Sequence, residues 1–152
     1  MTDSKIVHDT ISVSRRLDAS PERVFAAWTD PAARRKWEPT PIGFETIYQG
    51  HDFTIDGIEN SEMRKDGQTL ATFQTRFVDI VPNQRIISTV RVMSNGQVMS
   101  SSQHTIHLIA DGKGTHLHCT EQVAWLMGKS LRAEHEGGWK TLLDRLQAVV
   151  EA

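Results

Sequence analysis

The chain has 152 residues, 38% of them hydrophobic and 24% charged, which is typical of one globular domain with a buried core. Its net charge of −2 gives no reason to expect nucleic acid or a membrane surface as a partner. Cys119 is the single cysteine and no apolar run approaches the roughly 18 residues of a membrane span, so we expect a cytoplasmic protein without an internal disulfide bond.

The N-terminal third predicts one strand and two short helices. Residues 6–17 are rich in β-forming residues and predict the strand. Ser20-Pro21 is typical of a helix start, with serine as the capping residue and proline in the first turn. Asp30-Pro31 repeats this signal and predicts a second helix that runs to about Trp37, where Pro39 and Pro41 stop it.

The middle of the chain predicts an antiparallel sheet. Asp66-Gly67 and Asn95-Gly96 are strong hairpin turns, and a loop of four residues is expected at 111–114. Consecutive hairpins make neighbouring strands antiparallel. The predicted strands are 43–48, 52–65, 68–80, 84–94, 97–110 and 115–125.

The last quarter predicts one long helix over residues 129–150. Its apolar stripe would pack across the sheet and leave a cavity between them. Gly137-Gly138 costs a helix about 1 kcal/mol per glycine relative to alanine, so we expect either a close approach to a strand or room for a ligand there. The stripe consists of Leu131, His135, Gly138, Trp139, Leu142, Leu143, Leu146, Val149 and Val150.

This order of elements resembles the START-like, helix-grip superfamily. RRLDASPERVFAAWTDP at 15–31 resembles the opening of the branch named after the activator of the heat-shock-protein-90 ATPase. Further similarities to that branch are IVPNQRI at 80–86, TEQ at 120–122, HEGGW at 135–139 and LDRL at 143–146. Together these motifs cover nearly the whole chain.

The resemblance implies a single α+β domain over residues 1–152. Its curved antiparallel sheet of six or seven strands would have two short helices after the first strand and the long helix across its concave face. It also implies a ligand-holding habit, although related proteins bind lipids, hormones or polyketides, act as cyclases or serve as co-chaperone domains. The sequence departs from the branch at Asp56-Gly57, where a Gly-Gly pair is usual, and at Arg91, where an acidic or neutral residue is usual.

A histidine and a glutamate are predicted to meet inside the cavity. If residue 110 pairs with residue 115, His104 lies opposite Glu121 on the apolar face, about 5 Å apart at Cβ. Such a pair can transfer protons as a general base and its orienting group, or it can orient a ligand. The structural alternative is a satisfied buried polar contact.

The Asn95-Gly96 turn extends the predicted polar lining. A two-residue turn places Arg91 opposite Ser100 and Thr89 opposite Ser102, all on the concave face with His104. A cavity with an inward arginine favours a ligand with an anionic or hydrogen-bonding end. One β-bulge would reverse this alternation and turn Arg91 toward water.

Aromatic residues are the expected walls. Phe25, Trp28 and Trp37 would close one end of the cavity, with core packing as the structural alternative. His135 and Trp139 are four residues apart on the long helix and either pack it on the sheet or line the cavity.

Three other groups have ordinary structural explanations. His107, His116 and His118 fall on the outer face of the sheet, so we expect exposed strand histidines and no metal site. Cys119 faces inward without a basic neighbour and should be an inert core thiol. The basic run at 34–36 is typical of a solvated helix face.

Three functions remain open from the sequence. The first is binding of a small apolar or amphipathic molecule by Phe25, Trp28, Trp37, Arg91, Ser100, Ser102, His104, Glu121, His135 and Trp139, with no cofactor. The second is a cyclase, dehydratase or isomerase in which His104 is the general base, Glu121 orients it and Arg91 stabilises an enolate. The third is a co-chaperone-like interaction module. An exposed edge strand could also pair two copies into a homodimer.

Overall fold

The computed structural model describes residues 5–38 and 43–152. Pro39 and Pro41, which were predicted to stop the second helix, lie outside the described residues. The elements in chain order are β1 (Val7–Leu17), α1 (Pro21–Thr29), α2 (Pro31–Trp37), β2 (Phe44–His51), β3 (Ile58–Lys65), β4 (Gln68–Val81), β5 (Arg85–Ser94), β6 (Gln97–Asp111), β7 (Gly114–Trp125) and α3 (Arg132–Val150).

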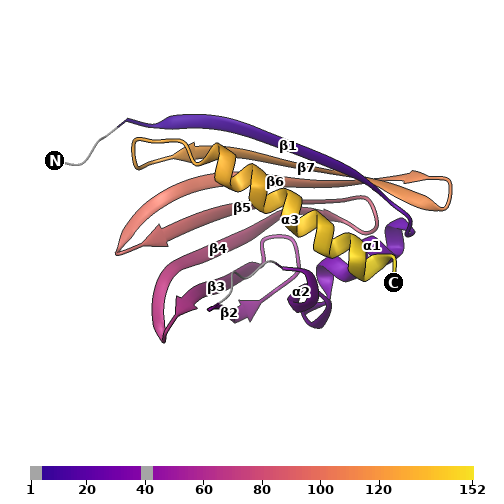
Figure 1. The fold of residues 1–152 in the computed structure, drawn as a ribbon, viewed down its shortest axis with the longest axis horizontal. Helices are drawn as coiled ribbons and strands as arrows, with labels where there is room; N and C mark the ends of the chain where they lie inside the picture. Colours follow the sequence, from indigo (N-terminus) through magenta and orange to yellow (C-terminus); the bar gives the residue numbers. More distant parts are fainter. Residues whose placement is uncertain (1–4, 39–42) are drawn as a thin grey trace.

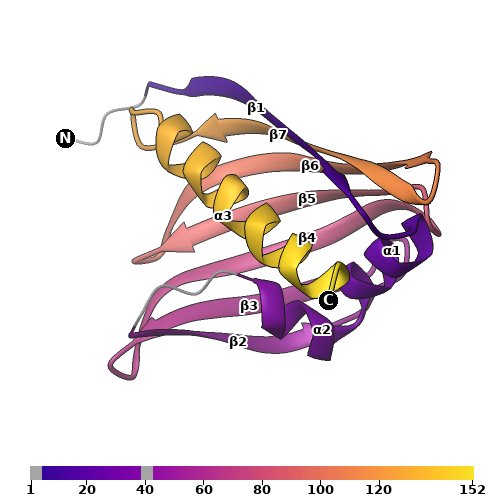
Figure 2. The ribbon, with the colours of Figure 1, turned by 45° about the vertical axis from the view of Figure 1, so that its right-hand side comes forward.

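Seven antiparallel strands form one curved sheet in the order β1-β7-β6-β5-β4-β3-β2. Helix α3 crosses the concave face diagonally, and α1 and α2 lie beside its C-terminal end (Figure 1). The turned view shows α3 running across the sheet from beside β7 toward α1 and α2 (Figure 2). This is the α+β helix-grip arrangement, so the predicted fold class is confirmed. No helix among the described residues is long and apolar enough to span a membrane.

The predicted helix starts are formed by the capping side chains. The Ser20 Oγ accepts a hydrogen bond from the Arg23 backbone N–H at 3.2 Å, and Asp30 Oδ1 accepts one from the Ala32 N–H at 3.0 Å. Each bond satisfies a backbone donor that has no partner within its helix. Both helices therefore begin at the proline that follows the cap.

The hairpin turns also form as predicted. Asp66-Gly67 and Asn95-Gly96 all have positive φ, between 51° and 76°, which is the conformation of a tight two-residue turn. The last hairpin differs slightly, because Asp111 pairs with Gly114 and leaves a loop of two residues instead of four. The predicted pairing of Ala110 with Thr115 is retained.

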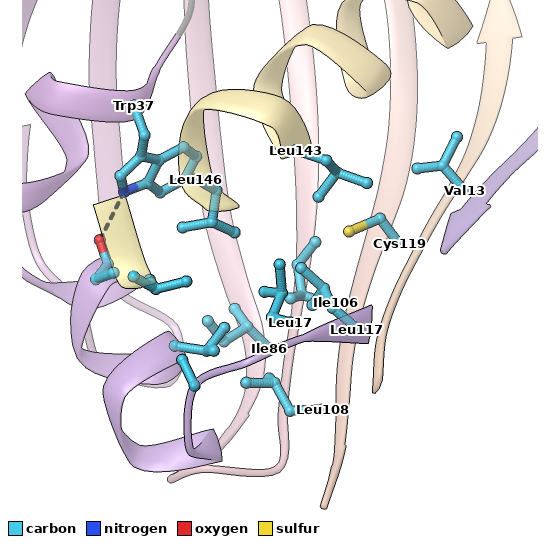
Figure 3. Packing of buried hydrophobic residues seen from close by; sticks show 14 of the residues in the cluster. Val13, Leu17, Trp37, Ile86, Ile106, Leu108, Leu117, Cys119, Leu143 and Leu146 are labelled. Carbon is cyan, nitrogen blue, oxygen red and sulfur yellow. Dashed lines mark hydrogen bonds between the residues drawn. The ribbon is translucent and has the colours of Figure 1, made fainter. Parts of the chain in front are cut away.

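The core is concentrated under the C-terminal half of α3. Leu143 and Leu146 point from α3 toward Ile106 and Leu117 on the sheet, and all four are buried (Figure 3). Val150, also buried, ends this apolar stripe. The N-terminal half of α3 holds no fully buried side chain among its described residues. There Trp139, with Leu131 just before the helix, packs against a second, smaller cluster of Ile11, Val123 and Trp125.

Gly137 and Gly138 lie in that less buried half of α3. A Cβ built on either glycine meets no atom within 4 Å, and both residues are exposed. Neither a close approach to a strand nor room for a ligand explains them, contrary to the sequence-based expectation. They face solvent.

Candidate functional site

A partly enclosed cavity of about 360 Å³ lies between the concave face of β2–β6, the helices α1 and α2, and the middle of α3. Most of its wall is aromatic or aliphatic, and charged side chains stand at one end. The lining residues are Trp28, Arg34, Glu38, Thr46, Tyr48, Phe53, Glu59, Ser61, Met63, Phe73, Thr75, Phe77, Ile86, Ser88, Val90, His104, Ile106, Trp139 and Leu142.

His104 and Glu121 meet as the sequence predicts. They are paired across β6 and β7, and His104 Nε2 lies 3.3 Å from Glu121 Oε2. His104 is half-buried and lines the cavity, whereas the Glu121 side chain is only 3% exposed. The pair therefore presents the imidazole to the cavity and holds the carboxylate behind it.

Helix α3 supplies two further partners for Glu121. His135 Nδ1 lies 3.1 Å from Oε1, and the Trp139 indole N–H donates to Oε1 at 3.2 Å. The Trp139 ring also packs edge-on against His104, with centroids 5.5 Å apart. This polar clamp (His104, Glu121, His135 and Trp139) joins the thinly packed half of α3 to the sheet.

The clamp fixes the ionised form of Glu121. Burial on its own would raise the pKa of this carboxyl, but the hydrogen bonds and charges of His104 and His135 outweigh it and hold the pKa well below its usual range. A carboxylate in this state accepts hydrogen bonds and orients imidazoles. It is a poor proton acceptor at neutral pH, so proton transfer at this site would fall to His104.

Arg91 does not reach the cavity, which corrects the sequence-based prediction. The register between β5 and β6 shifts at Val92 and Met93, so Arg91 pairs with Ser101 instead of Ser100. A β-bulge adds one residue to one strand and reverses which side chains face inward beyond it. Arg91 and Thr89 are consequently exposed on the convex face, and Ser88 and Val90 line the cavity in their place.

The two predicted serines face inward with different roles. The Ser102 Oγ lies 3.1 Å from His104 Nε2 and helps to hold the imidazole. Ser100 is buried opposite Trp125, beyond the residues that line the cavity.

The predicted aromatic residues also separate. Trp28 lines the cavity. Trp37 lies behind it, 1% exposed, with its indole N–H donating to the Ala27 carbonyl at 2.9 Å, so it belongs to the core (Figure 3). Phe25 packs against the Phe53 ring at a centroid distance of 6.0 Å and supports the wall from outside. Only one of the three therefore lines the cavity.

Sequence reasoning missed a second polar group, at the α2 end of the cavity. The Arg34 guanidinium forms two hydrogen bonds with Glu59, at 2.6 and 3.0 Å, and reaches Glu38 Oε1 at 2.6 Å. His51 Nδ1 contacts the same Glu59 carboxylate, and His51 Nε2 is buried without a hydrogen-bond partner among the described residues. We call Arg34, Glu38, Glu59 and His51 the acidic end of the cavity.

This group corrects the prediction for the basic run at 34–36. Arg35 and Lys36 are exposed as expected, but the Arg34 side chain is only 14% exposed. A sequence signal did exist, since Arg34 and Glu38 are four residues apart on one helix and can pair. Its partner Glu59 is 25 residues away in sequence and carries no local signal.

Burial and neighbouring charges together shift the pKa values of two groups at the acidic end. It raises the pKa of Glu38, and the nearby Arg34 charge offsets only part of that effect. For Arg34, burial would lower the pKa, but Glu59 and Glu38 overcome it and the pKa is raised. The guanidinium is thus held charged between two carboxylates.

The remaining candidates lie outside the cavity. His107 and His116 are exposed on the convex face, and His118 contacts the Ser14 Oγ at 2.8 Å. Within the described ranges, no group of three histidine, cysteine or acidic side chains is arranged to hold a metal ion. Cys119 is buried, and burial raises its pKa to about 12, which agrees with an inert thiol.

Known proteins share both the sequence pattern and the fold. A family model described as "Activator of Hsp90 ATPase homolog 1-like protein" matches residues 18–151. A crystal structure of a protein from Rhizobium loti is 35% identical, with a TM-score of 0.85, and the match covers 95% of this chain and 99% of that one. No curated protein matches the chain.

Two further solved structures agree. A protein from Chromobacterium violaceum is 32% identical with a TM-score of 0.80, covering 94% of this chain and 97% of its own. A protein from Rhizobium leguminosarum is 29% identical with a TM-score of 0.83, covering 97% of both chains. All three of these matches therefore cover at least 94% of this chain.

Proposed function

Because the chain belongs to the family described as "Activator of Hsp90 ATPase homolog 1-like protein", we propose that it binds a small amphipathic molecule between the sheet and α3. The observation that carries this proposal is the cavity of about 360 Å³, whose walls are mainly apolar and whose ends carry charged or hydrogen-bonding groups. Sites for small molecules commonly combine an apolar wall with a few polar groups that fix orientation.

The residues of the site have different roles in this proposal. Trp28, Phe53 and Trp139 contact the apolar body of the ligand. His104 offers the edge of an imidazole whose orientation the clamp fixes through Glu121. Because three groups already bond Glu121, it acts on the ligand through His104 instead of touching it.

Filling the cavity tests this proposal. Saturable fluorescence enhancement of the neutral probe N-phenylnaphthylamine by the wild-type protein is expected. Val90→Trp should abolish it, because Val90 lines the cavity. The matched control is Thr89→Trp on the convex face, which should bind as the wild type does.

Thr75→Trp, on the neighbouring strand β4, serves as a second filling variant if Val90→Trp does not fold. Circular dichroism establishes which variants are folded. Probe binding that survives in a folded filling variant would contradict a site in this cavity.

A second candidate function is proton-transfer catalysis of the cyclase, dehydratase or isomerase kind. It is favoured by His104, which faces the cavity while Glu121 and Ser102 orient it. Arg91, however, is exposed on the other face of the sheet, so the enolate-stabilising group of that scheme is lost. Binding without catalysis is therefore the function that the geometry supports best.

A further inference from the structure

The cavity is lined by more carboxylates than guanidinium groups. Of the residues that line it, Glu38 and Glu59 carry carboxylates and Arg34 carries the single guanidinium. Arg91, which would have added a second positive charge, is on the convex face. Deeper in the wall, Glu121 adds another buried carboxylate behind His104.

The Arg34 guanidinium is already engaged and is poorly placed to bind an anion. Its Nε and both terminal nitrogens are engaged by Glu38 and Glu59, and its guanidinium carbon lies 5.3 Å from the centre of the Tyr48 ring. A ligand carboxylate placed here would have to break those bonds while facing two carboxylates. Like charges brought together in a site of low polarity repel each other strongly.

Glu38 is the group best placed to receive a cation. Arg34 reaches only its Oε1, and among the described residues no hydrogen bond engages Oε2. The side chain is 22% exposed and lines the cavity, so a ligand can contact it. Its raised pKa indicates that one shared guanidinium does not fully compensate the buried charge.

An aromatic ring of the cavity wall favours a cation as well. Trp28 lines the same cavity as Glu38, whereas the Tyr48 ring already faces the Arg34 guanidinium. The face of an aromatic ring attracts an ammonium group, and the attraction strengthens when the site excludes water.

We propose that the cavity selects amphipathic ligands that carry a protonated amine, with the ammonium paired to Glu38 and a flat apolar body lying toward His104 and Trp139. This inference rests on the proposed function and names the class of its ligand. The ligand would thus carry a cationic group in place of the anionic group that an inward Arg91 would have favoured.

Three probes of matched shape test the inference: naphthylethylamine, naphthylethanol and naphthylacetate. Their dissociation constants are measured by displacement of N-phenylnaphthylamine at neutral pH. The amine should bind at least about tenfold more tightly than the carboxylate, with the alcohol between them.

Glu38→Gln should bring the amine and the carboxylate to within about threefold of each other, because it removes the ammonium partner. Glu45→Gln is the matched control, since Glu45 is exposed on β2 and does not line the cavity. If Glu38→Gln does not fold, the order of the three affinities in the wild-type protein decides the inference.

The outcomes separate the inference from the proposed function. Saturable binding of the alcohol with equal or tighter binding of the carboxylate than of the amine would overturn the inference and leave the proposed function standing. If none of the three probes displaces N-phenylnaphthylamine and that probe itself does not bind, the proposed function fails and the inference fails with it.

Discussion

At the scale of single residues, Glu121 connects the two layers of the fold. Its carboxylate, on β7, is almost fully buried. It is contacted by His104 of β6 and by His135 and Trp139 of α3. Burying a charge without partners is very unfavourable, so these contacts are a condition for its being there. The polar clamp is thus both a structural joint and part of the cavity wall.

Replacing Glu121 by glutamine should lower the free energy of unfolding by about 1–3 kcal/mol near neutral pH, because a neutral amide replaces the buried carboxylate that contacts His104, His135 and Trp139. Urea denaturation measures the change. Glu134→Gln, an exposed position in the first turn of α3, is the control and should change it by less than about 0.5 kcal/mol.

The pH dependence of stability gives a second readout for the same residue. The pKa of Glu121 is lower in the folded protein than its usual 4.5. Its stabilising contribution is therefore complete above pH 4.5 and is lost as pH falls below that value toward the folded pKa. The wild type should lose more stability than Glu121→Gln on acidification, and parallel curves would contradict the clamp.

At the scale of elements, a loop glycine and two helix glycines differ in the space that a side chain would have. Gly57 lies in the loop before β3, where an added Cβ would stand 2.2 Å from the Asp52 carbonyl oxygen. Asp56 precedes it with a φ of 67°, so Asp56-Gly57 forms a tight bend. Gly137 and Gly138 in α3, by contrast, have open space around them.

Alanine substitutions should therefore have opposite signs. Gly57→Ala should destabilise the protein by about 1–3 kcal/mol, because the backbone must move to admit the methyl group. Gly137→Ala should stabilise it by about 0.5–1 kcal/mol, because alanine favours the helix. Chemical denaturation compares both with the wild type, and a destabilising Gly137→Ala would show that this face of α3 is covered.

At the scale of the whole molecule, one apolar cluster joins the sheet to all three helices. It contains Val24 of α1. Trp37 of α2, Leu146 of α3 and Leu117 of β7 also belong to it and are labelled in Figure 3. The cavity borders this cluster at Phe77, Ile86 and Ile106 and reaches the middle of α3 at Trp139 and Leu142. The core cluster thus holds the C-terminal half of α3, and the polar clamp holds its N-terminal half.

Leu146→Ala should test this shared core. Leu146 is 0% exposed, so its truncation should lower the free energy of unfolding by about 2–5 kcal/mol. Because this cluster joins all three helices to the sheet, far-ultraviolet circular dichroism and tryptophan fluorescence should report a single shared transition. Separate transitions for helix and sheet would contradict a single cooperative core. Leu70→Ala, at an exposed strand position, is the control.

Sequence alone determined the features that depend on neighbours along the chain. Capping residues set the starts of α1 and α2, and Asp-Gly and Asn-Gly pairs set the hairpins. The short last hairpin fixed the pairing of His104 with Glu121, because a tight turn and strict alternation leave one register.

Only the tertiary structure decided the rest of the site. An extra residue on β6, Met99, opposite Val92 and Met93 turned Arg91 outward, since one extra residue reverses the alternation without changing the apolar pattern that predicts a strand. The meeting of Arg34 with Glu59, and of His135 with Glu121, depends on where helices lie on the sheet. That placement is set by packing among distant residues, which no local pattern in the chain encodes.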